Sequence, residues 1–171
     1  GIDYGPINSN KSNTVMTIIQ RGPGGIPQII YAKKYLGAQA DHAYIAQDIP
    51  RQKSVWSSKL IGADHGLGES LNAQVRQKIG YPYLIAYQHM PNQADRIKFN
   101  TKLPAYTTNR SQVILEFARR IKERKVIFPD WKYFKPFAED ILNMAIEYSE
   151  DNAKMKVINT GPDDFAHATI Y

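Results

Sequence analysis

Residues 59–87, KLIGADHGLGESLNAQVRQKIGYPYLIAY, contain the pattern that decides the fold class of this chain. The short apolar run at 59–64 predicts a strand, residues 69–79 predict a helix, and residues 83–87 predict a second strand. A strand–helix–strand unit joins two parallel strands through a helix that crosses over the sheet. This stretch therefore predicts part of an α/β domain.

The residues before this stretch predict three more strands and a helix. GIDYG (1–5) predicts a short buried strand that Gly5-Pro6 ends, and residues 14–20 and 28–36 are rich in apolar and β-branched side chains. The RGPGGIP sequence between the second and third strands is typical of a turn, so we expect a hairpin there. Residues 38–52 carry apolar side chains at helical spacing and predict a helix.

The residues after this stretch predict mainly helices. Residues 109–122 have one apolar stripe behind an N-cap at Asn109, and 134–148 predict a second amphipathic helix. Short strands are expected at 126–128 and 156–158, before a final helix whose first turn suits Pro162. Residues 88–108 fit either an extra hairpin or an ordered loop. We therefore expect an α/β fold whose mixed sheet, an antiparallel meander plus parallel strands, is flanked by helices.

The composition limits the class of protein. With 171 residues, 43% of them hydrophobic, the chain has the size and core of a single domain. It has no cysteine and no apolar run long enough to cross a membrane, so we expect a cytoplasmic protein without a membrane partner. Because the chain enters a strand-like segment at Gly1, we expect residues 1–171 to be a domain excised from a longer protein.

Three acidic clusters lie at the ends of predicted elements. Asp3 lies in the first strand, Asp64 ends a later apolar strand, and Asp163 and Asp164 open the last helix. A carboxylate in a buried strand is costly unless it is paired or binds a cation, and ligand sites favour the carboxyl ends of strands. The clusters therefore predict a site for Mg²⁺ or Mn²⁺, where two ions would clamp the oxygens of a phosphodiester. His167 lies one helical turn further and can reach the same pocket.

The net charge of +6 alone favours nucleic acid no more than an ordinary solvated surface. If the four aspartates share one pocket, the remaining surface has a net charge of +10, because four negative charges are set apart. Each acid also has a structural interpretation. Asp3 would suit a turn cap or a lysine partner, Asp64 a turn, and the aspartate pair any helix N-terminus.

The other candidates are weaker. His65 and His167 taken singly fit ordinary hydrogen-bonded histidines, and we assign no site role to His42 or His89, which lie outside the three acidic clusters. In the helix predicted at 38–52 the acids are Asp41 and Asp48, and we assign neither to a metal.

At these motifs the chain resembles the nuclease domain of the large terminase subunit of tailed bacteriophages, which has a ribonuclease H-like fold. GIDYG matches the family's first-strand aspartate, LIGADHGLG its second acidic residue, and GPDDFAHA its closing aspartate motif. Residues 109–148 resemble the family's two helices around a short FP strand. The similarity covers nearly the whole chain. The chain departs from the wider fold because it has no glutamate on the first helix, and it contains no GxxxxGK[ST] phosphate loop, so it would be the nuclease without the ATPase motor.

The resemblance implies a two-metal endodeoxyribonuclease that cuts concatemeric viral DNA during packaging, in the host cytoplasm. Asp3 would bridge the two Mg²⁺ or Mn²⁺ ions, with Asp64 and either Asp163 or, as we favour, Asp164 as flanking ligands. His167 would bind an ion or orient the water. Double-stranded DNA is the expected partner, with the small terminase subunit and the portal as further partners of the full-length protein.

The phosphates of DNA would meet lysine and arginine side chains. Our candidates are Lys33, Lys34, Arg96, Lys98, Lys102, Arg119 and Arg120. Two other functions stay open from the sequence. One is a ribonuclease H-like resolvase or transposase core, and the other is a basic DNA-binding module without catalytic activity.

Overall fold

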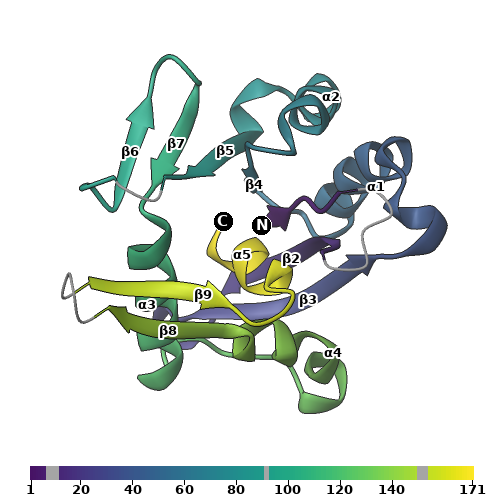
Figure 1. Ribbon diagram of the computed structural model, residues 1–171. Coiled ribbons are helices and arrows are strands. Elements are labelled where there is room, and N and C mark those ends of the chain that lie inside the picture. Colours follow the sequence, from purple (N-terminus) through teal and green to yellow (C-terminus); the bar gives the residue numbers. More distant parts are fainter. Residues whose placement is uncertain (7–11, 91–92, 150–153) are drawn as a thin grey trace.

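The computed structural model describes residues 1–6, 12–90, 93–149 and 154–171 (Figure 1). Within these residues the chain forms a seven-stranded sheet in the order β3-β2-β1-β4-β5-β7-β6 and a two-stranded sheet of β8 and β9. The strands are β1 (Ile2–Asp3), β2 (Thr14–Arg21), β3 (Pro27–Tyr35), β4 (Ile61–Asp64), β5 (Leu84–His89), β6 (Ile97–Asn100), β7 (Ala105–Thr108), β8 (Met144–Ser149) and β9 (Lys154–Asn159). The helices are α1 (His42–Val55), α2 (Glu69–Ile79), α3 (Arg110–Lys122), α4 (Trp131–Leu142) and α5 (Asp164–Ile170).

The large sheet is mixed, as the sequence predicts. β1, β2 and β3 form the antiparallel meander, whereas β1, β4, β5 and β7 are parallel to one another. The segment 88–108, which fitted a hairpin or a loop, contains the antiparallel hairpin of β6 and β7 at one edge of the sheet. The predicted α/β fold, with a mixed sheet of antiparallel and parallel strands flanked by helices, is therefore confirmed.

Side chains alternate along the strands and so give each face of the sheet its own core. Ile2 and Ala63 pack on one face with apolar side chains of α1 and α2. Val15 packs on the other face with Phe134 of α4 and Phe165 of α5. The residues that follow Ile2 and Ala63 in β1 and β4 therefore point toward the face that α5 covers.

Polar side chains fix the starts of two helices. Asn109 accepts a hydrogen bond from the backbone N–H of Gln112 at 3.1 Å, which confirms it as the N-cap of α3. Asp41 accepts from the N–H groups of Ala43 and Tyr44 and caps α1. Asp41 therefore has a structural role.

The helix predicted at 134–148 is wrong in its second half. α4 ends at Leu142, and Met144–Ser149 is instead β8, paired antiparallel with β9. Residues 144–149 alternate apolar and smaller or polar side chains, the period of a strand, although Ala145 and Tyr148 also continue the helical stripe. The side chain of Asn143 donates to the carbonyl oxygen of Pro162 at 2.8 Å where the helix ends. The strand expected at 126–128 is only a single bridge between residues 28 and 127.

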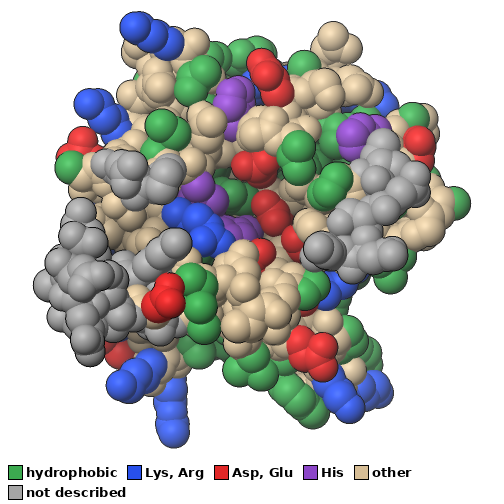
Figure 2. Space-filling model, viewed as in Figure 1, with side chains coloured by type: hydrophobic (Ala, Val, Ile, Leu, Met, Phe, Trp, Pro, Cys, Tyr) green, Lys and Arg blue, Asp and Glu red, His purple; other side chains and the backbone are tan. Residues whose placement is uncertain are grey.

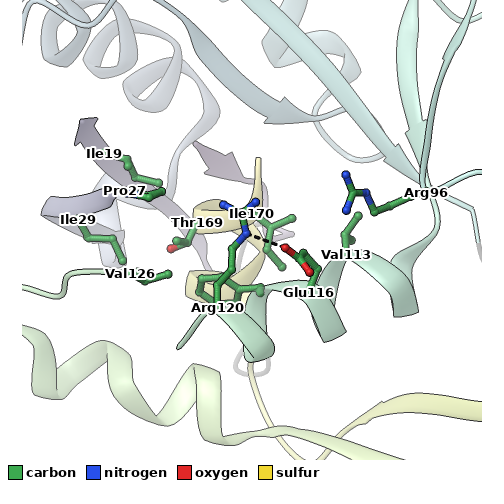
Figure 3. A pocket seen from close by; sticks show the side chains of 11 residues that line it. Ile19, Pro27, Ile29, Arg96, Val113, Glu116, Arg120, Val126, Thr169 and Ile170 are labelled. Atoms are coloured by element: carbon green, nitrogen blue, oxygen red, sulfur yellow. Dashed lines mark hydrogen bonds and ion pairs between the residues drawn. The ribbon is translucent and has the colours of Figure 1, made fainter. Parts of the chain in front are cut away.

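An apolar cavity of about 230 Å³ lies between β3, α3 and α5 (Figure 3). Ile29 and Val113 are among its walls, and Arg120 and Glu116, which pair along α3 at 2.8 Å, also line it. None of the acids predicted for the metal site lines this cavity. No helix among the described residues is both long and apolar enough to span a membrane.

Candidate active site

Asp3 and Asp64 lie next to each other at the carboxyl ends of two neighbouring parallel strands. Ile2 of β1 is opposite Ala63 of β4, which places the following residues, the two aspartates, side by side. Both side chains leave the sheet on the face covered by α5. Figure 2 shows acidic and histidine side chains gathered in the middle of this view, over the ends of β1 and β4 and over α5. The structure thus brings together acids that are 61 positions apart in sequence.

Asp64 is held through its backbone and its side chain. The side-chain amide of Asn72 donates to the Asp64 carbonyl oxygen at 2.7 Å, and the Tyr4 hydroxyl donates to Asn72 at 3.0 Å. Burial raises the pKa of the Asp64 carboxyl, although the backbone N–H groups of Gly66 and Leu67 act in the opposite direction. The buried Tyr4–Asn72 pair therefore fixes the end of β4 from the opposite face of the sheet.

The last helix lies directly against these strands. A Cβ at Gly62 would stand 1.9 Å from the carbonyl oxygen of Tyr171, so glycine permits the close approach of α5 to β4. At the start of α5, Asp140 accepts a hydrogen bond from the backbone N–H of Phe165 at 3.0 Å. The other oxygen of Asp140 accepts from Lys34 Nζ at 2.7 Å. These contacts hold the acidic start of α5 in place over the sheet.

The two aspartates at the start of α5 have different partners. Asp164 is buried, and its oxygens accept from Ser12 Oγ at 2.6 Å and from the backbone N–H of Asn13 at 2.7 Å. Asp163 is the N-cap residue, and its Oδ2 accepts from Nε2 of His167 at 2.8 Å. We favoured Asp164 because it shares a helix face with His167, but the histidine hydrogen-bonds to Asp163 instead.

Negative charges accumulate around Asp3. Burial raises the pKa of its carboxyl well above the ordinary value, and the charges of Asp64, Asp164 and Asp163 raise it further against the opposing effect of Arg110. Burial also raises the pKa of Asp164. Within the described residues the Asp3 carboxylate has no hydrogen bond or ion pair. A buried cluster of like charges is unfavourable unless a cation joins it.

His89 belongs to this site, although its surroundings in the sequence gave no reason to select it. Its Nε2 lies 3.0 Å from Nδ1 of His167, and its Nδ1 lies 2.8 Å from the Thr108 hydroxyl. Burial lowers the pKa of His89 to about 3, and the charges of His167 and Arg110 act in the same direction, so the ring is neutral near pH 7. A neutral His89 can donate to a neutral His167, or accept from a protonated one and donate to Thr108. The network is therefore satisfied in both protonation states of His167.

Arg110 is a second residue that the sequence did not indicate. It is the first residue of α3, and its Nη2 donates to Asp163 at 3.1 Å and to the side chain of Asn159 at 2.8 Å. The same nitrogen lies 3.5 Å from Nε2 of His167. Because that histidine nitrogen already donates to Asp163, we interpret the contact as packing of two donors around one carboxylate. Arg110 thus places a positive charge at the edge of the acidic cluster.

Comparison with known proteins supports this architecture. No family model matches the chain, and no curated protein sequence matches it. The large terminase nuclease from thermophilic phage G20c matches in structure, with a TM-score of 0.66 over 99% of this chain and 77% of that chain. The chain has the fold of a large terminase nuclease. Since only 15% of the residues are identical, the resemblance expected from the sequence is confirmed at the level of the fold.

The predicted DNA-binding residues fall into two groups, according to whether they form ion pairs within the chain. Four of them form ion pairs with carboxylates of the chain: Lys33 with Asp48, Lys34 with Asp140, Arg119 with Glu116 and Glu123, and Arg120 with Glu116. Arg96, Lys98 and Lys102 lie beside or on the β6–β7 hairpin and form no ion pair within the described residues. The second group therefore retains the charge that a phosphate would need.

The donor chemistry of this cluster suits a hard divalent cation, because β1, β4 and α5 each offer carboxylate oxygens. Among the described residues, however, no group of three or more Asp, Glu, His or Cys side chains is arranged to hold a metal ion. The contacts explain the difference. Asp164 is turned toward Ser12 and Asn13, and Asp163 toward His167. The carboxylates are suitable ligands for a divalent cation, and the side chains of Asp163 and Asp164 would have to turn toward it.

Proposed function

We propose that this chain is a metal-dependent DNA endonuclease that cuts concatemeric viral DNA during genome packaging. The observation that carries the proposal is the meeting of Asp3 and Asp64 with the acidic start of α5, in a fold shared with a terminase nuclease. The reaction would be phosphodiester hydrolysis, in which a water oxygen bonds to phosphorus and the 3′ oxygen leaves.

Asp3, Asp64 and Asp164 would hold the ions, Mg²⁺ or Mn²⁺, with Asp163 and His167 beside them. Bound ions of this kind supply an activated water and stabilise the leaving oxygen, and we propose two of them. Asp3 is the best placed of the ligands because it lies beside Asp64 on the face that α5 covers, and no described residue occupies its oxygens. The buried surroundings of Asp3 would also keep bulk water from screening its charge.

The histidine pair and Arg110 would act next to the acids. His89 fixes the ring orientation of His167 through the contact between their ring nitrogens, and the other ring nitrogen of His167 is held by Asp163. Arg110 reduces the repulsion among the acids and can bind a phosphate oxygen at the edge of the cluster. Among the ligand candidates, Asp163 is the one whose charge Arg110 and His167 already compensate.

Double-stranded DNA is the proposed substrate, bound mainly through its phosphates. In a longer protein the small terminase subunit and the portal are the proposed partners, and the host cytoplasm is the proposed place of action. The cleavage activity separates this function from that of a DNA-binding module without activity, which would bind the same duplexes and leave them intact. A preference for branched DNA would instead favour a resolvase.

Supercoiled plasmid tests the proposal directly. The chain should nick or linearise the plasmid with Mn²⁺ or Mg²⁺ and leave it intact in EDTA, because the carboxylates alone cannot activate water. Asp3→Asn should abolish cutting, whereas the matched change Asp95→Asn, at an exposed acid outside the cluster, should preserve it. Cutting that persists undiminished in EDTA would rule out the metal-dependent mechanism.

A further inference from the structure

A groove of about 480 Å³ lies next to the candidate active site, between α2 and the turn that joins β6 to β7. Glu69, Arg76 and Tyr81 line it on the α2 side, and Lys102 lines it from the hairpin. His65 also lines it and directly follows Asp64 in the chain. The groove therefore borders the residue that follows β4, one position from Asp64, on the side of the sheet where α2 lies.

The two permanent cations of the groove are not neutralised by the protein. Neither Arg76 nor Lys102 forms an ion pair in the described part of the chain, and Glu69 is the single acid among the lining residues. One nitrogen of Arg76 donates to the Leu84 carbonyl oxygen at 3.3 Å, while its buried Nε–H has no acceptor among the residues that the structure describes. A guanidinium with unused donors and no carboxylate partner suits an anionic ligand.

An aromatic ring accompanies these charges. The Tyr81 side chain is 64% exposed, and the guanidinium of Arg76 lies 4.7 Å from its ring centre. Leu103 and Pro104 form an apolar wall on the hairpin side. Cations beside an exposed aromatic ring are the combination that binds a nucleic acid strand, through its phosphates and through the faces of its sugars and bases.

We propose that this groove holds the DNA backbone next to the bond to be cut, with Arg76 and Lys102 each binding a phosphate. This inference rests on the proposed function, because the position of the groove, one residue from Asp64, is what selects DNA as the occupant. The charge pattern supports it. As candidates for binding phosphate, Lys33, Lys34 and Arg120 cannot be distinguished from Lys102 in the sequence, but in the structure they are already paired with acids.

The test measures binding of a fluorescent duplex in EDTA at several salt concentrations, so it does not depend on cleavage. Lys102→Gln and the double variant Arg76→Gln/Lys102→Gln remove the positive charge and keep a polar, unbranched side chain. Lys122→Gln, at an exposed lysine in the last turn of α3, is the matched control. Each lost phosphate contact should reduce the slope of log affinity against log salt by about 1 and weaken binding about 10-fold, and the control should change neither.

Two outcomes would overturn the inference. One is unchanged duplex affinity and salt slope in both variants. The other is loss of binding to a poly-glutamate peptide with unchanged DNA binding, which would make the groove a site for an acidic protein. Because Arg76 also contacts Leu84 and Tyr81, thermal melting checks that the double variant is folded. If it is not, the single variant Lys102→Gln, at an exposed residue, still tests the inference. If the chain binds DNA through the groove but never cuts it, the proposed function fails and the groove assignment stands.

Discussion

Replacing Asp3 with asparagine should abolish cleavage and, without metal, leave the chain at least as stable as the parent. The pKa of Asp3 is raised in the folded chain, so the unfolded chain releases this proton at a lower pH than the folded one. The carboxylate therefore destabilises the fold above the folded-state pKa, and the destabilisation disappears as the pH falls toward about 3.8. Asparagine keeps the shape of the side chain and removes this effect.

The magnitude follows from the neighbours of Asp3. Asparagine relieves repulsion from Asp64, Asp164 and Asp163 and loses only the smaller attraction to Arg110. The new amide group can donate to the adjacent carboxylates, which adds a favourable hydrogen bond. We expect a net gain of about 1 kcal/mol near pH 7, which raises the melting temperature by about 2–4 °C in a domain of this size.

Thermal melts in EDTA and in Mn²⁺, each at pH 7 and pH 5, measure this effect. A cation that binds only the folded site adds about 2.7 kcal/mol at 100 times its Kd, so Mn²⁺ should raise the melting temperature of the parent and barely affect the variant. The advantage of the variant in EDTA should shrink at pH 5. If Asp3 has a structural role, the variant melts clearly below the parent in EDTA and Mn²⁺ shifts neither protein. That result would refute the reasoning.

Two further changes test the surroundings of the acids. His89→Ala should slow plasmid cutting with Mn²⁺ about 10-fold, because the ring of His167 loses the contact that orients it. Thr108→Val, at the end of the network, should slow cutting less. Equal rates in the parent and both variants would contradict the network's role. Lys34→Met should lower the free energy of unfolding in urea by about 2–3 kcal/mol, less than for a fully buried ion pair because this lysine is partly exposed. The control Lys98→Met, at an exposed lysine, should change it by under about 0.5 kcal/mol. Equal urea midpoints for the two variants would show that the Lys34–Asp140 ion pair contributes little.

The fold and two of the acids could be predicted because their signals are local. Asp3 and Asp64 end apolar strands, and the strand–helix–strand pattern makes those strands parallel, so their ends must lie at one edge. The error after Leu142 arose where one segment fits two periods, since Ala145 and Tyr148 extend a helical stripe inside an alternating strand. Local pattern cannot choose between the two, and pairing with β9 decided it.

His89 and Arg110 could not be predicted because their roles depend on register and docking. Asp64 is opposite Tyr87 in the parallel pair of β4 and β5, so His89, two residues beyond Tyr87, points to the same face. That register is unknown until the strands are aligned. Arg110 reaches Asp163 only because α3 begins beside the start of α5. The sequence contains both residues without any sign of these neighbours.

The ion pairs of Lys33 and Lys34 could not be predicted from the sequence for the same reason. These pairs also distinguish two kinds of buried acid in the structure. Burial raises the pKa of Asp48, but hydrogen bonds from Lys33 and Arg51 outweigh it and lower the pKa to about 2. Asp140 likewise has Lys34 as its partner. This fold therefore supplies cations to the acids that hold it together. Around Asp3 the described residues supply mainly other acids, and Arg110 binds elsewhere in the cluster. Asp3 lies at the carboxyl edge of parallel strands and against an acidic helix start, and the described residues leave its charge uncompensated. This contrast with Asp48 and Asp140 supports the proposal that a cation from outside the chain binds there.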